Sequence, residues 1–234
     1  MCSSCGPAPI THSSLHHRII HHFIEAGSAP SIDDLAAGLA QPREAVVEGL
    51  KGLQEYHGVV LHPGSSEIWV IHPFSTAPTP FWVQGAERSW WGNCAWCSLG
   101  IAALLKEDVT TTTTLGGETR QVSLKIVGGR LRDEGYFVHF PIPMKQAWDN
   151  VIYTCSTMLL FDSEAAIDQW CLRHRVPRGD AQPVAKVWEF AKAWYGRHLD
   201  EDWTKWSAAE AKALFERFGL CGPTWDIPEA ASRF

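Results

Sequence analysis

The hydrophobic pattern of the first seventy residues predicts three helices followed by a hairpin. Apolar side chains recur at helical spacing in three segments, residues 13–26, 31–39 and 42–53. Ser31 is a typical helix N-cap, with Asp33 and Asp34 in a first turn where the helix dipole favours negative charge. Two short apolar runs follow, at residues 59–61 and 68–71, separated by a Pro-Gly-Ser-Ser turn. This order is typical of a winged helix.

The rest of the chain alternates between strand and helix patterns. Its segments are a proline-rich extended stretch at 72–88, a loop running into a helix at 90–105, two or three strands within 109–131, and a strand at 136–140. Residues 147–161 fit either a helix or a strand. Helices are predicted at residues 163–174, 183–198 and 208–218.

These elements predict an α+β fold with a helical part first. We expect a winged-helix-like subdomain, then a mixed or antiparallel β-sheet core flanked by helices. The predicted ranges are a flexible tail at 1–11, the helical subdomain at 12–71, a proline-rich linker at 72–88 and the larger domain, which would bind a metal or catalyse a reaction, at 89–234.

Charge and composition narrow the class of protein. The 234 residues carry a net charge of −6, and the sequence pI is about 6.0. An acidic chain lacks the basic surface that nucleic acid or an anionic membrane requires. No apolar run approaches the ~20 residues of a membrane span, and the N-terminus has no signal-peptide pattern. We expect a cytoplasmic protein without nucleic-acid or membrane partners; the sequence indicates no oligomeric state.

The winged-helix outline raises the possibility of a metal-responsive DNA-binding regulator. In the third predicted helix, Arg43 and Lys51 are offset by Glu44 and Glu48. Contact with phosphates needs more positive charge than this. We therefore expect a packing or lid function for the helical part.

Seven cysteines make thiol chemistry the leading question. Cys94 and Cys97 form a C-x-x-C motif, which is found in zinc sites, redox dithiols and soft-metal sites, and also as two structural thiols. Cys2 and Cys5 form a second such pair and could complete a four-thiolate zinc site. A thioredoxin-like dithiol would need a βαβ context, which the pattern does not predict here.

Other candidate ligands are less distinctive. Cys155 lies in an apolar run, and Cys171 and Cys221 have no partner pattern, so each alone would be interpreted as a structural thiol. A histidine cluster begins just before the first predicted helix and continues into it: His12, His16, His17, His21 and His22. His12/His16 and His17/His21 each have i,i+4 spacing. Such pairs can bind a transition metal weakly, but the simpler interpretation is a polar helix face.

The surroundings of these cysteines resemble the organomercurial (alkylmercury) lyase family. Residues 91–96, Trp-Gly-Asn-Cys-Ala-Trp, are similar to the motif around the first catalytic cysteine of that family. Cys155, with Met158-Leu-Leu-Phe161 and Trp170 after it, is similar to the segment that carries the second. The helical segment, the hairpin and the His72-Pro-Phe-Ser connection also resemble the family. The resemblance extends from about Leu15 to Trp203.

The resemblance implies an enzyme that cleaves a carbon–mercury bond by protonolysis. Cys94 and Cys155 would bind mercury as thiolates, and an acidic group would protonate the leaving carbon. Mercury would be the substrate and the product ion, with no organic cofactor. The expected partner is a small organometallic compound or a soft metal ion.

The chain departs from the family at Cys97, where the family typically has an aspartate. We expect Cys97 to be the third member of the site, either transferring a proton once mercury acidifies it or acting as a third sulfur ligand. Cys94, Cys97 and Cys155 are thus the predicted catalytic and metal-binding residues. The alternative function is a three-thiolate protein that binds copper(I), mercury(II) or zinc(II) on a lyase scaffold with little lyase activity.

Overall fold

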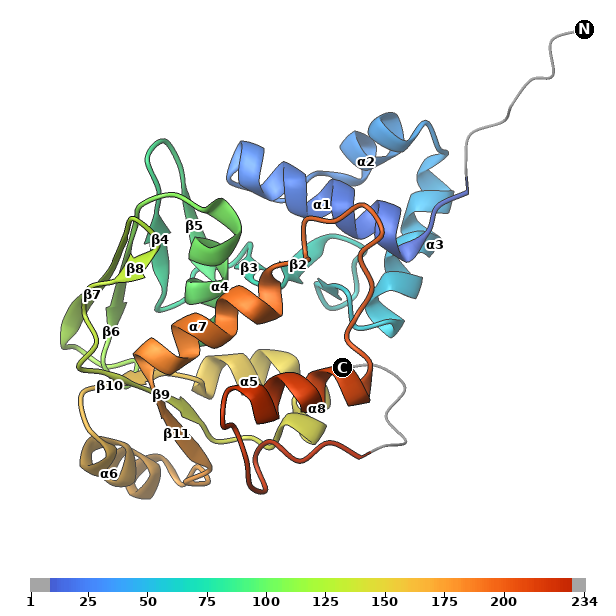
Figure 1. Ribbon diagram of the computed structural model, residues 1–234. Helices are drawn as coiled ribbons and strands as arrows, with labels where there is room; N and C mark the ends of the chain where they lie inside the picture. The colour runs from blue at the N-terminus through green and yellow to red at the C-terminus, as the bar shows by residue number, and fades with distance from the viewer. Residues whose placement is uncertain (1–8, 229–234) are drawn as a thin grey trace, which may run out of the picture.

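The structure is a computed structural model that describes residues 9–228, and they form an α+β fold as predicted (Figure 1). The helices are α1 His12–Ala26, α2 Ile32–Leu39, α3 Arg43–Glu55, α4 Ala95–Leu105, α5 Val151–Thr157, α6 Glu164–His174, α7 Val184–Tyr195 and α8 Ala208–Arg217. The strands are β1 Val60–Leu61, β2 Ile68–Ile71, β3 Phe74–Ser75, β4 Trp82–Gln84, β5 Ser89–Gly92, β6 Val109–Thr114, β7 Gln121–Val127, β8 Arg130–Leu131, β9 Phe137–Phe140, β10 Leu160–Phe161 and β11 Asp180–Pro183. A short 3₁₀ helix occupies Met144–Gln146.

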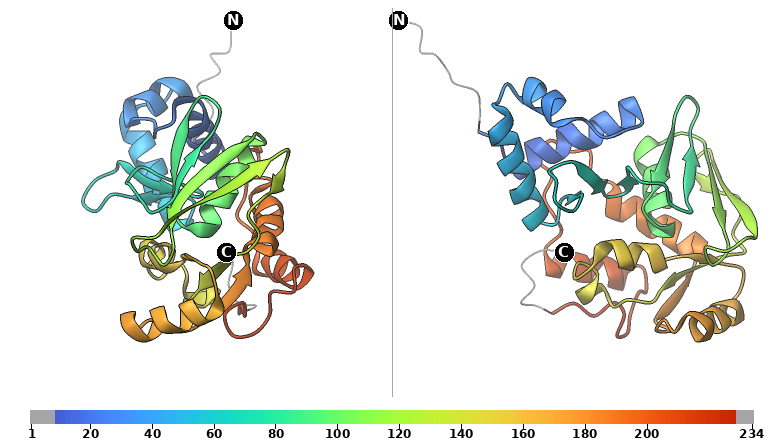
Figure 2. Two further views of the ribbon diagram at one scale, coloured as in Figure 1. Left: turned by 90° about the vertical axis from the view of Figure 1, so that its left-hand side faces the viewer. Right: turned by 180° about the vertical axis from the view of Figure 1, so that it is seen from behind.

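The first three helices form as their sequences predict. Leu15, Ile19 and Phe23 are the buried stripe of α1. Ser31 caps α2. Its side chain accepts a hydrogen bond from the Asp34 N–H, and the Asp34 side chain accepts one from the Ser31 N–H. Figure 2 shows α1 to α3 gathered at one end of the molecule, beside the hairpin of β1 and β2.

An eight-stranded antiparallel sheet runs from this hairpin into the larger part of the chain. Its order is β1-β2-β3-β5-β4-β6-β7-β8. Residues 72–88 therefore do more than link two parts, because β3 and β4 within them are strands of the sheet and Val83 is fully buried. Pro73, Pro78 and Pro80 lie outside these strands, where no ladder donor is lost. The proposed division at 71 and 89 remains a prediction.

Helix α4 lies between the large sheet and α7. Nearly every side chain of α4 is buried, because strands β3, β4 and β5 lie on one side of it and α7 packs on another. Figure 1 shows α7 crossing α4 on the side away from the sheet. The pattern of residues 147–161 fits either a helix or a strand, and this stretch contains one of each, helix α5 followed by strand β10. Strand β10 pairs with β9, and β9 with β11, a strand that the sequence pattern did not predict.

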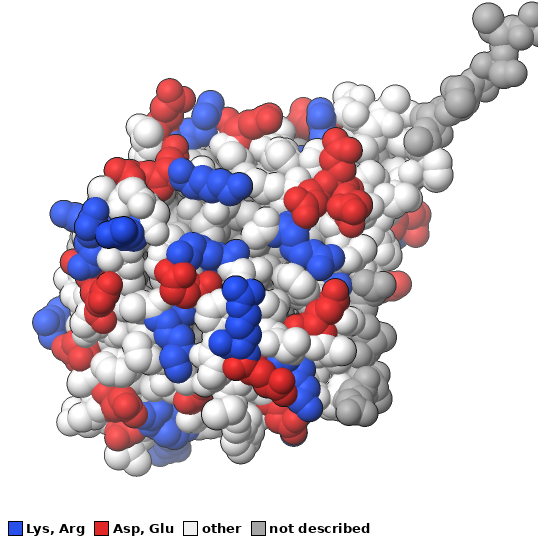
Figure 3. Space-filling view, in the orientation of Figure 1, with Lys and Arg blue, Asp and Glu red and all other residues white. Residues whose placement is uncertain are grey.

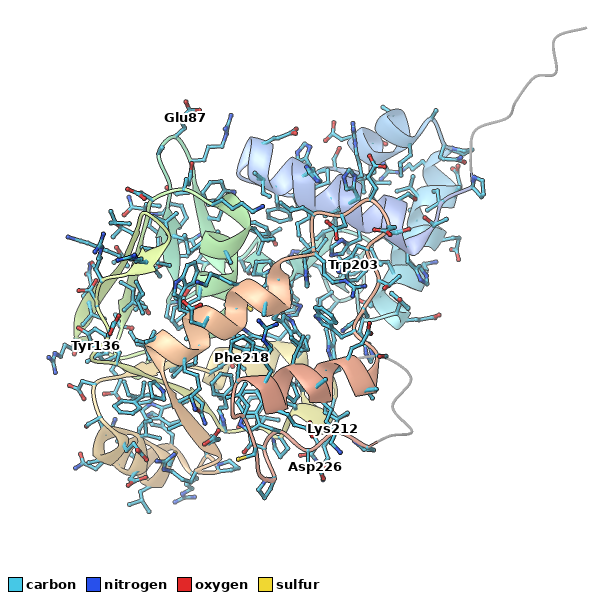
Figure 4. All side chains as sticks on the ribbon, in the orientation of Figure 1. Glu87, Tyr136, Trp203, Lys212, Phe218 and Asp226 are labelled. Atoms are coloured by element: carbon cyan, nitrogen blue, oxygen red, sulfur yellow. The ribbon has the colours of Figure 1, made fainter. Side chains whose placement is uncertain are left out.

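The chain between α7 and α8 returns to the N-terminal helices. This return segment, residues 196–207, passes beside α1, and Figure 4 labels Trp203 within it. The His21 Nε2 atom is 3.2 Å from the carbonyl oxygen of Leu199, and the His16 ring stacks on Trp203 with centroids 3.5 Å apart. Residues nearly two hundred positions apart thus form one wall of the interior.

The outer surface carries charges of both signs. Figure 3 shows Lys and Arg interspersed with Asp and Glu on the face that it presents. No helix within residues 9–228 has both the length and the apolar character to span a bilayer.

Candidate functional site

Cys94 is placed at the start of α4 as its N-cap. Its sulfur accepts a hydrogen bond from the backbone N–H of Cys97 at 3.2 Å. The two sulfurs are 3.1 Å apart, and both cysteines are reduced. A C-x-x-C motif at a helix start brings both thiols to the same end of the helix, where the dipole favours negative charge.

Backbone contacts place the start of α4 against the end of α5. Gly92 approaches α4 so closely that a Cβ there would be 2.9 Å from the Cα of Ser98. The N–H of Ala95 donates to the carbonyl of Met158 at 3.1 Å, and the Met158 sulfur is 3.5 Å from the Cys94 sulfur. This contact holds α5, and with it Cys155, beside the C-x-x-C motif.

Cys155 and His72 complete the cluster. The Cys155 sulfur is 3.6 Å from the Nε2 atom of His72, which also lies 3.2 Å from the side-chain amide of Asn93. Ligand atoms of His72, Cys97 and Cys155 all lie within 4.8 Å of one another. The site therefore offers three soft sulfurs and one imidazole, a donor set suited to thiophilic ions.

Burial and mutual hydrogen bonding separate the pKa values of the three thiols. Burial raises the pKa of Cys97, but hydrogen bonds with Cys155 and Cys94 and the neighbouring His72 outweigh it and bring that pKa well below its ordinary value. Burial is the main cause that raises the pKa of Cys94. For Cys155, a hydrogen bond with Cys94 lowers the pKa, but hydrogen bonding with Cys97 and burial outweigh it, so the pKa is raised. The cluster thus favours one thiolate, on Cys97, beside two thiols.

Tyr195 of α7 contacts the cluster from the other side. Its hydroxyl oxygen is 3.5 Å from the Cys97 sulfur. Burial raises the pKa of the Tyr195 phenol well above its usual value, so the hydroxyl keeps its proton. It is therefore positioned to donate a hydrogen bond to the Cys97 thiolate.

The sulfurs line a cavity of about 80 Å³. This volume is several times the ~10–15 Å³ that one water molecule needs, so the cavity admits a small ligand. The aromatic rings of the lining are those of Trp96, Trp148, Trp194, Tyr195, Trp203 and Trp206. Within the part of the chain that the structure describes, no aspartate or glutamate lines the cavity. Sulfurs, imidazoles, the Lys205 amine and aromatic rings are therefore the main chemical groups of the lining.

The structure gathers the predicted site residues Cys94, Cys97 and Cys155 in this one cavity. Their catalytic and metal-binding roles stay predictions. The two carboxylates near Cys155 in sequence are absent from the lining: Asp149 is exposed, and Asp162 pairs with Arg120 at 2.6 Å elsewhere.

The other candidate ligands named from the sequence lie in different places. Cys2 and Cys5, proposed as partners in a four-thiolate site, lie outside the described residues. Cys171 is buried on α6 near His139, with 3.6 Å between its sulfur and the Nε2 atom, whereas Cys221 is exposed. The interpretation of the α1 histidines as a polar face is wrong for His16, which is 1% exposed and lines the cavity.

Sequence patterns did not identify His72, Tyr195 and Lys205 as cavity residues. His72 precedes Pro73 between two short strands, and Tyr195 ends a helix whose other aromatic residues fill the core. Each would be assigned a packing function from sequence alone. Only the fold brings His72 and Tyr195 beside the thiols and Lys205 into the same cavity.

Comparisons with known proteins find a matching family and a similar solved structure. The model of the alkylmercury lyase family matches residues 74–196, which include all three clustered cysteines. The fold is similar to that of a protein described as the mercury-bound form of MerB2, with a TM-score of 0.65 and 18% identity over 81% of this chain and 92% of that one. Comparison with curated proteins gives no match. The resemblance noted in the sequence is confirmed: the chain belongs to the alkylmercury lyase family.

Proposed function

We propose that this protein cleaves the carbon–mercury bond of organomercurials by protonolysis, with Cys94, Cys97 and Cys155 as the sulfur ligands of mercury. The observation that carries the proposal is the convergence of three buried sulfurs on one small cavity. Thiolates are strong ligands of soft ions, and burial excludes the water that would compete for mercury. Membership of the family supports the class of reaction.

The proposed reaction begins with the Cys97 thiolate. It displaces the exchangeable ligand of the organomercurial and forms a sulfur–mercury bond. The Cys94 thiol, whose sulfur is 3.1 Å from that of Cys97, then binds mercury, which acidifies it. The carbon–mercury bond breaks, the carbon takes up one thiol proton as hydrocarbon, and mercury(II) stays bound to two sulfurs. Protons and charges balance without a carboxylate, in keeping with the cavity lining.

His72 is the proposed carrier of the proton between thiol and carbon. Burial lowers the pKa of His72, so its ring gives up a proton readily, and its Nε2 atom lies 3.6 Å from the Cys155 sulfur, within reach of a thiol proton. The direct contact between His72 and the Cys155 thiol supports this role.

A second candidate function is the binding of a soft metal ion without cleavage. Three sulfurs and one imidazole are four donors, the number that a tetrahedral zinc or a thiophilic ion takes from Cys₃His sites. In this function Cys97 would retain mercury(II) as a third thiolate instead of releasing it.

Release of benzene from phenylmercury separates the two functions. We expect protein mixed with one equivalent of phenylmercury to release benzene, measured by gas chromatography, and to retain mercury(II). Cys94→Ser should lower the benzene yield at least tenfold, because the site loses a sulfur ligand. Cys171→Ser is the matched control, since this buried cysteine lies outside the cavity.

The opposite result has a defined meaning. If the protein binds phenylmercury one to one and releases no benzene, while Cys97→Asp does release it, the native chain is a metal-binding protein. Metal analysis of the purified protein, by mass spectrometry, would then be expected to find one zinc or copper ion per chain, lost in Cys94→Ser.

A further inference from the structure

The two thiols of the C-x-x-C motif are in direct contact with each other. The Cys94 sulfur lies 3.1 Å from the Cys97 sulfur, and both residues are free thiols. Because a disulfide joins two sulfurs at about 2.0 Å, a further approach of about 1 Å would bring this pair to bonding distance. The proposed reaction uses the two sulfurs only as ligands of mercury, so the contact between them is a separate observation.

The start of α4 allows this approach without movement of any helix or strand. Cys94 is the N-cap and Cys97 lies in the first turn, so both side chains leave the same turn of backbone. Rotation about their Cα–Cβ bonds changes the sulfur–sulfur distance while the backbone of α4 stays in place. The disulfide oxidoreductases have two cysteines at this spacing, and in them the pair alternates between dithiol and disulfide.

Cys155 is a poorer disulfide partner because it belongs to another helix. It lies on α5, and the Ala95 N–H donates to the carbonyl of Met158 to hold the end of that helix against α4. Its sulfur is in contact with the Nε2 atom of His72, at 3.6 Å. A disulfide from Cys155 would tie two elements together across a packed interior, whereas a bond between Cys94 and Cys97 stays within one turn.

Burial restricts which oxidants can reach the pair. The exposed fractions of Cys94 and Cys97 are 0% and 1%, and the cavity that they line has a volume of about 80 Å³. Hydrogen peroxide is little larger than a water molecule and fits this space. Oxidised glutathione has the size of a six-residue peptide and does not fit. The accessible class of oxidant is therefore a small peroxide.

We propose that Cys94 and Cys97 form a site of reversible oxidation, at which a small peroxide converts the two thiols into a disulfide. One thiolate attacks hydrogen peroxide, the O–O bond breaks, and the sulfur becomes a sulfenic acid as hydroxide leaves and is protonated to water. The sulfur of the other thiol then attacks the sulfenic sulfur, the S–S bond forms, and the oxygen leaves as a second water. The two sulfurs together lose two electrons, and the peroxide gains them.

The disulfide would remove two of the three sulfur ligands of the cavity. The thiolate is the form of cysteine that binds a soft metal, and neither sulfur of a disulfide is a thiolate. Cys155 alone can hold an organomercurial by one bond, but it has no second sulfur beside it to complete the cleavage. This consequence rests on the proposed lyase function, and it makes cleavage dependent on reducing conditions.

Peptide mapping tests the disulfide without mercury. The full-length protein is treated with a small excess of hydrogen peroxide, alkylated and digested with trypsin, which releases Cys94 and Cys97 in one peptide of residues 89–106. We expect this peptide to carry no alkyl group and to be lighter than the reduced peptide by the mass of two hydrogen atoms. Treatment with tris(2-carboxyethyl)phosphine should restore alkylation. An unchanged peptide, a sulfinic acid, or a disulfide that includes Cys155 overturns the proposal.

Matched variants assign the bond to the pair. Cys94→Ser and Cys97→Ser should each abolish the disulfide within residues 89–106, whereas Cys155→Ser should still form it. Cys171→Ser is the control for loss of a buried thiol outside the cavity and should behave as the native chain does. Loss of the disulfide in Cys155→Ser would show that the bond forms through α5 and would contradict the proposal. The mapping of the native chain needs no variant, so a variant that misfolds leaves the test intact.

The size of the oxidant is tested in the folded protein. Oxidised glutathione should modify Cys221, which is exposed, and leave the peptide of residues 89–106 fully reduced. Hydrogen peroxide at the same concentration should form the disulfide in that peptide. Oxidation of the pair by glutathione as fast as the modification of Cys221 would overturn the restriction to small oxidants.

Release of benzene measures the consequence for the site. Protein that carries the disulfide, freed of peroxide by gel filtration, should release benzene from phenylmercury at least about tenfold more slowly than the reduced protein, because two sulfur ligands are lost. Reduction and removal of the reductant should restore the rate. Equal rates for the two forms would overturn the proposed closure of the site. If the reduced protein releases no benzene, the lyase function fails while the mapping still decides whether the disulfide forms.

Discussion

Gly100 gives α4 the clearance that the Tyr195 ring requires. A Cβ at this position would lie 2.5 Å from two carbons of that ring. Tyr195 is fully packed and contacts Cys97, so it has no free space to move into. Because Gly100 has no Cβ, the Tyr195 ring can pack against α4 and place its hydroxyl beside Cys97.

Gly100→Ala is expected to destabilise the protein although alanine favours a helix. The gain of about 1 kcal/mol in helix propensity is smaller than the cost of about 1–3 kcal/mol for overpacking. Urea denaturation should show a net loss of about 1–2 kcal/mol, with slower release of hydrocarbon. Gly52→Ala is the control: it lies in α3 with only the His12 ring at 3.4 Å, and should raise stability. Equal stability of Gly100→Ala and the native chain would show that Tyr195 can shift freely.

At the scale of elements, α4 begins at a residue that serves both the helix and the site. Cys94 accepts the Cys97 N–H as the N-cap, a position where serine is preferred and alanine is poor. Cys94→Ser should therefore keep the unfolding free energy close to that of the native chain, while Cys94→Ala should lose about 1 kcal/mol. Both should lose hydrocarbon release. Urea titrations of the two variants check this, and equal stabilities would contradict a capping function of the sulfur.

Helices whose own sequence contains a start signal could be predicted. Strands that form only because a neighbouring strand pairs with them could not. Ser31 and Ser163 mark the starts of α2 and α6, since each caps its helix with its own side chain. Strand β11, Asp-Ala-Gln-Pro, has neither alternation nor β-branched residues, and is a strand because β9 offers its backbone a partner. Strand β3 has two residues and lies next to a proline, so its sequence resembles a linker.

At the scale of the whole molecule, the cavity depends on contacts across the full chain. The cysteine cluster could be predicted because its local motifs resemble a family. The presence of His16 and Lys205 in one cavity lining could not, because it depends on the return segment packing against α1. Neither residue has a neighbour in sequence that indicates a cavity.

The burial of His16 and His198 predicts that the free energy of unfolding decreases in acid. Burial is the main cause that lowers the pKa of His198 to about 3 and the pKa of His16 well below its ordinary value. Between that pKa and the unfolded value of about 6.5, the unfolded chain binds more protons than the folded one, so stability decreases as pH falls. Each such histidine contributes a slope of about 1.4 kcal/mol per pH unit.

His198→Gln should remove one such contribution. Urea denaturation at pH 7.5 and at pH 5 should show a smaller loss of stability for the variant than for the native chain, by about 1–2 kcal/mol. The values at pH 7.5 serve as the internal reference, because neither histidine is protonated in either state there. Identical losses in both proteins would mean that His198 titrates alike when folded and unfolded.

The return segment has a consequence for how this protein can evolve. The family model covers residues 74–196, which hold every sulfur of the cluster, whereas His16, His198 and Lys205 all lie outside that range. Mutation or insertion in these flanking segments can therefore change the lining of the cavity while leaving the thiols untouched. Relatives that keep the three cysteines but differ in these flanks should differ in the shape and polarity of the cavity beside the thiols.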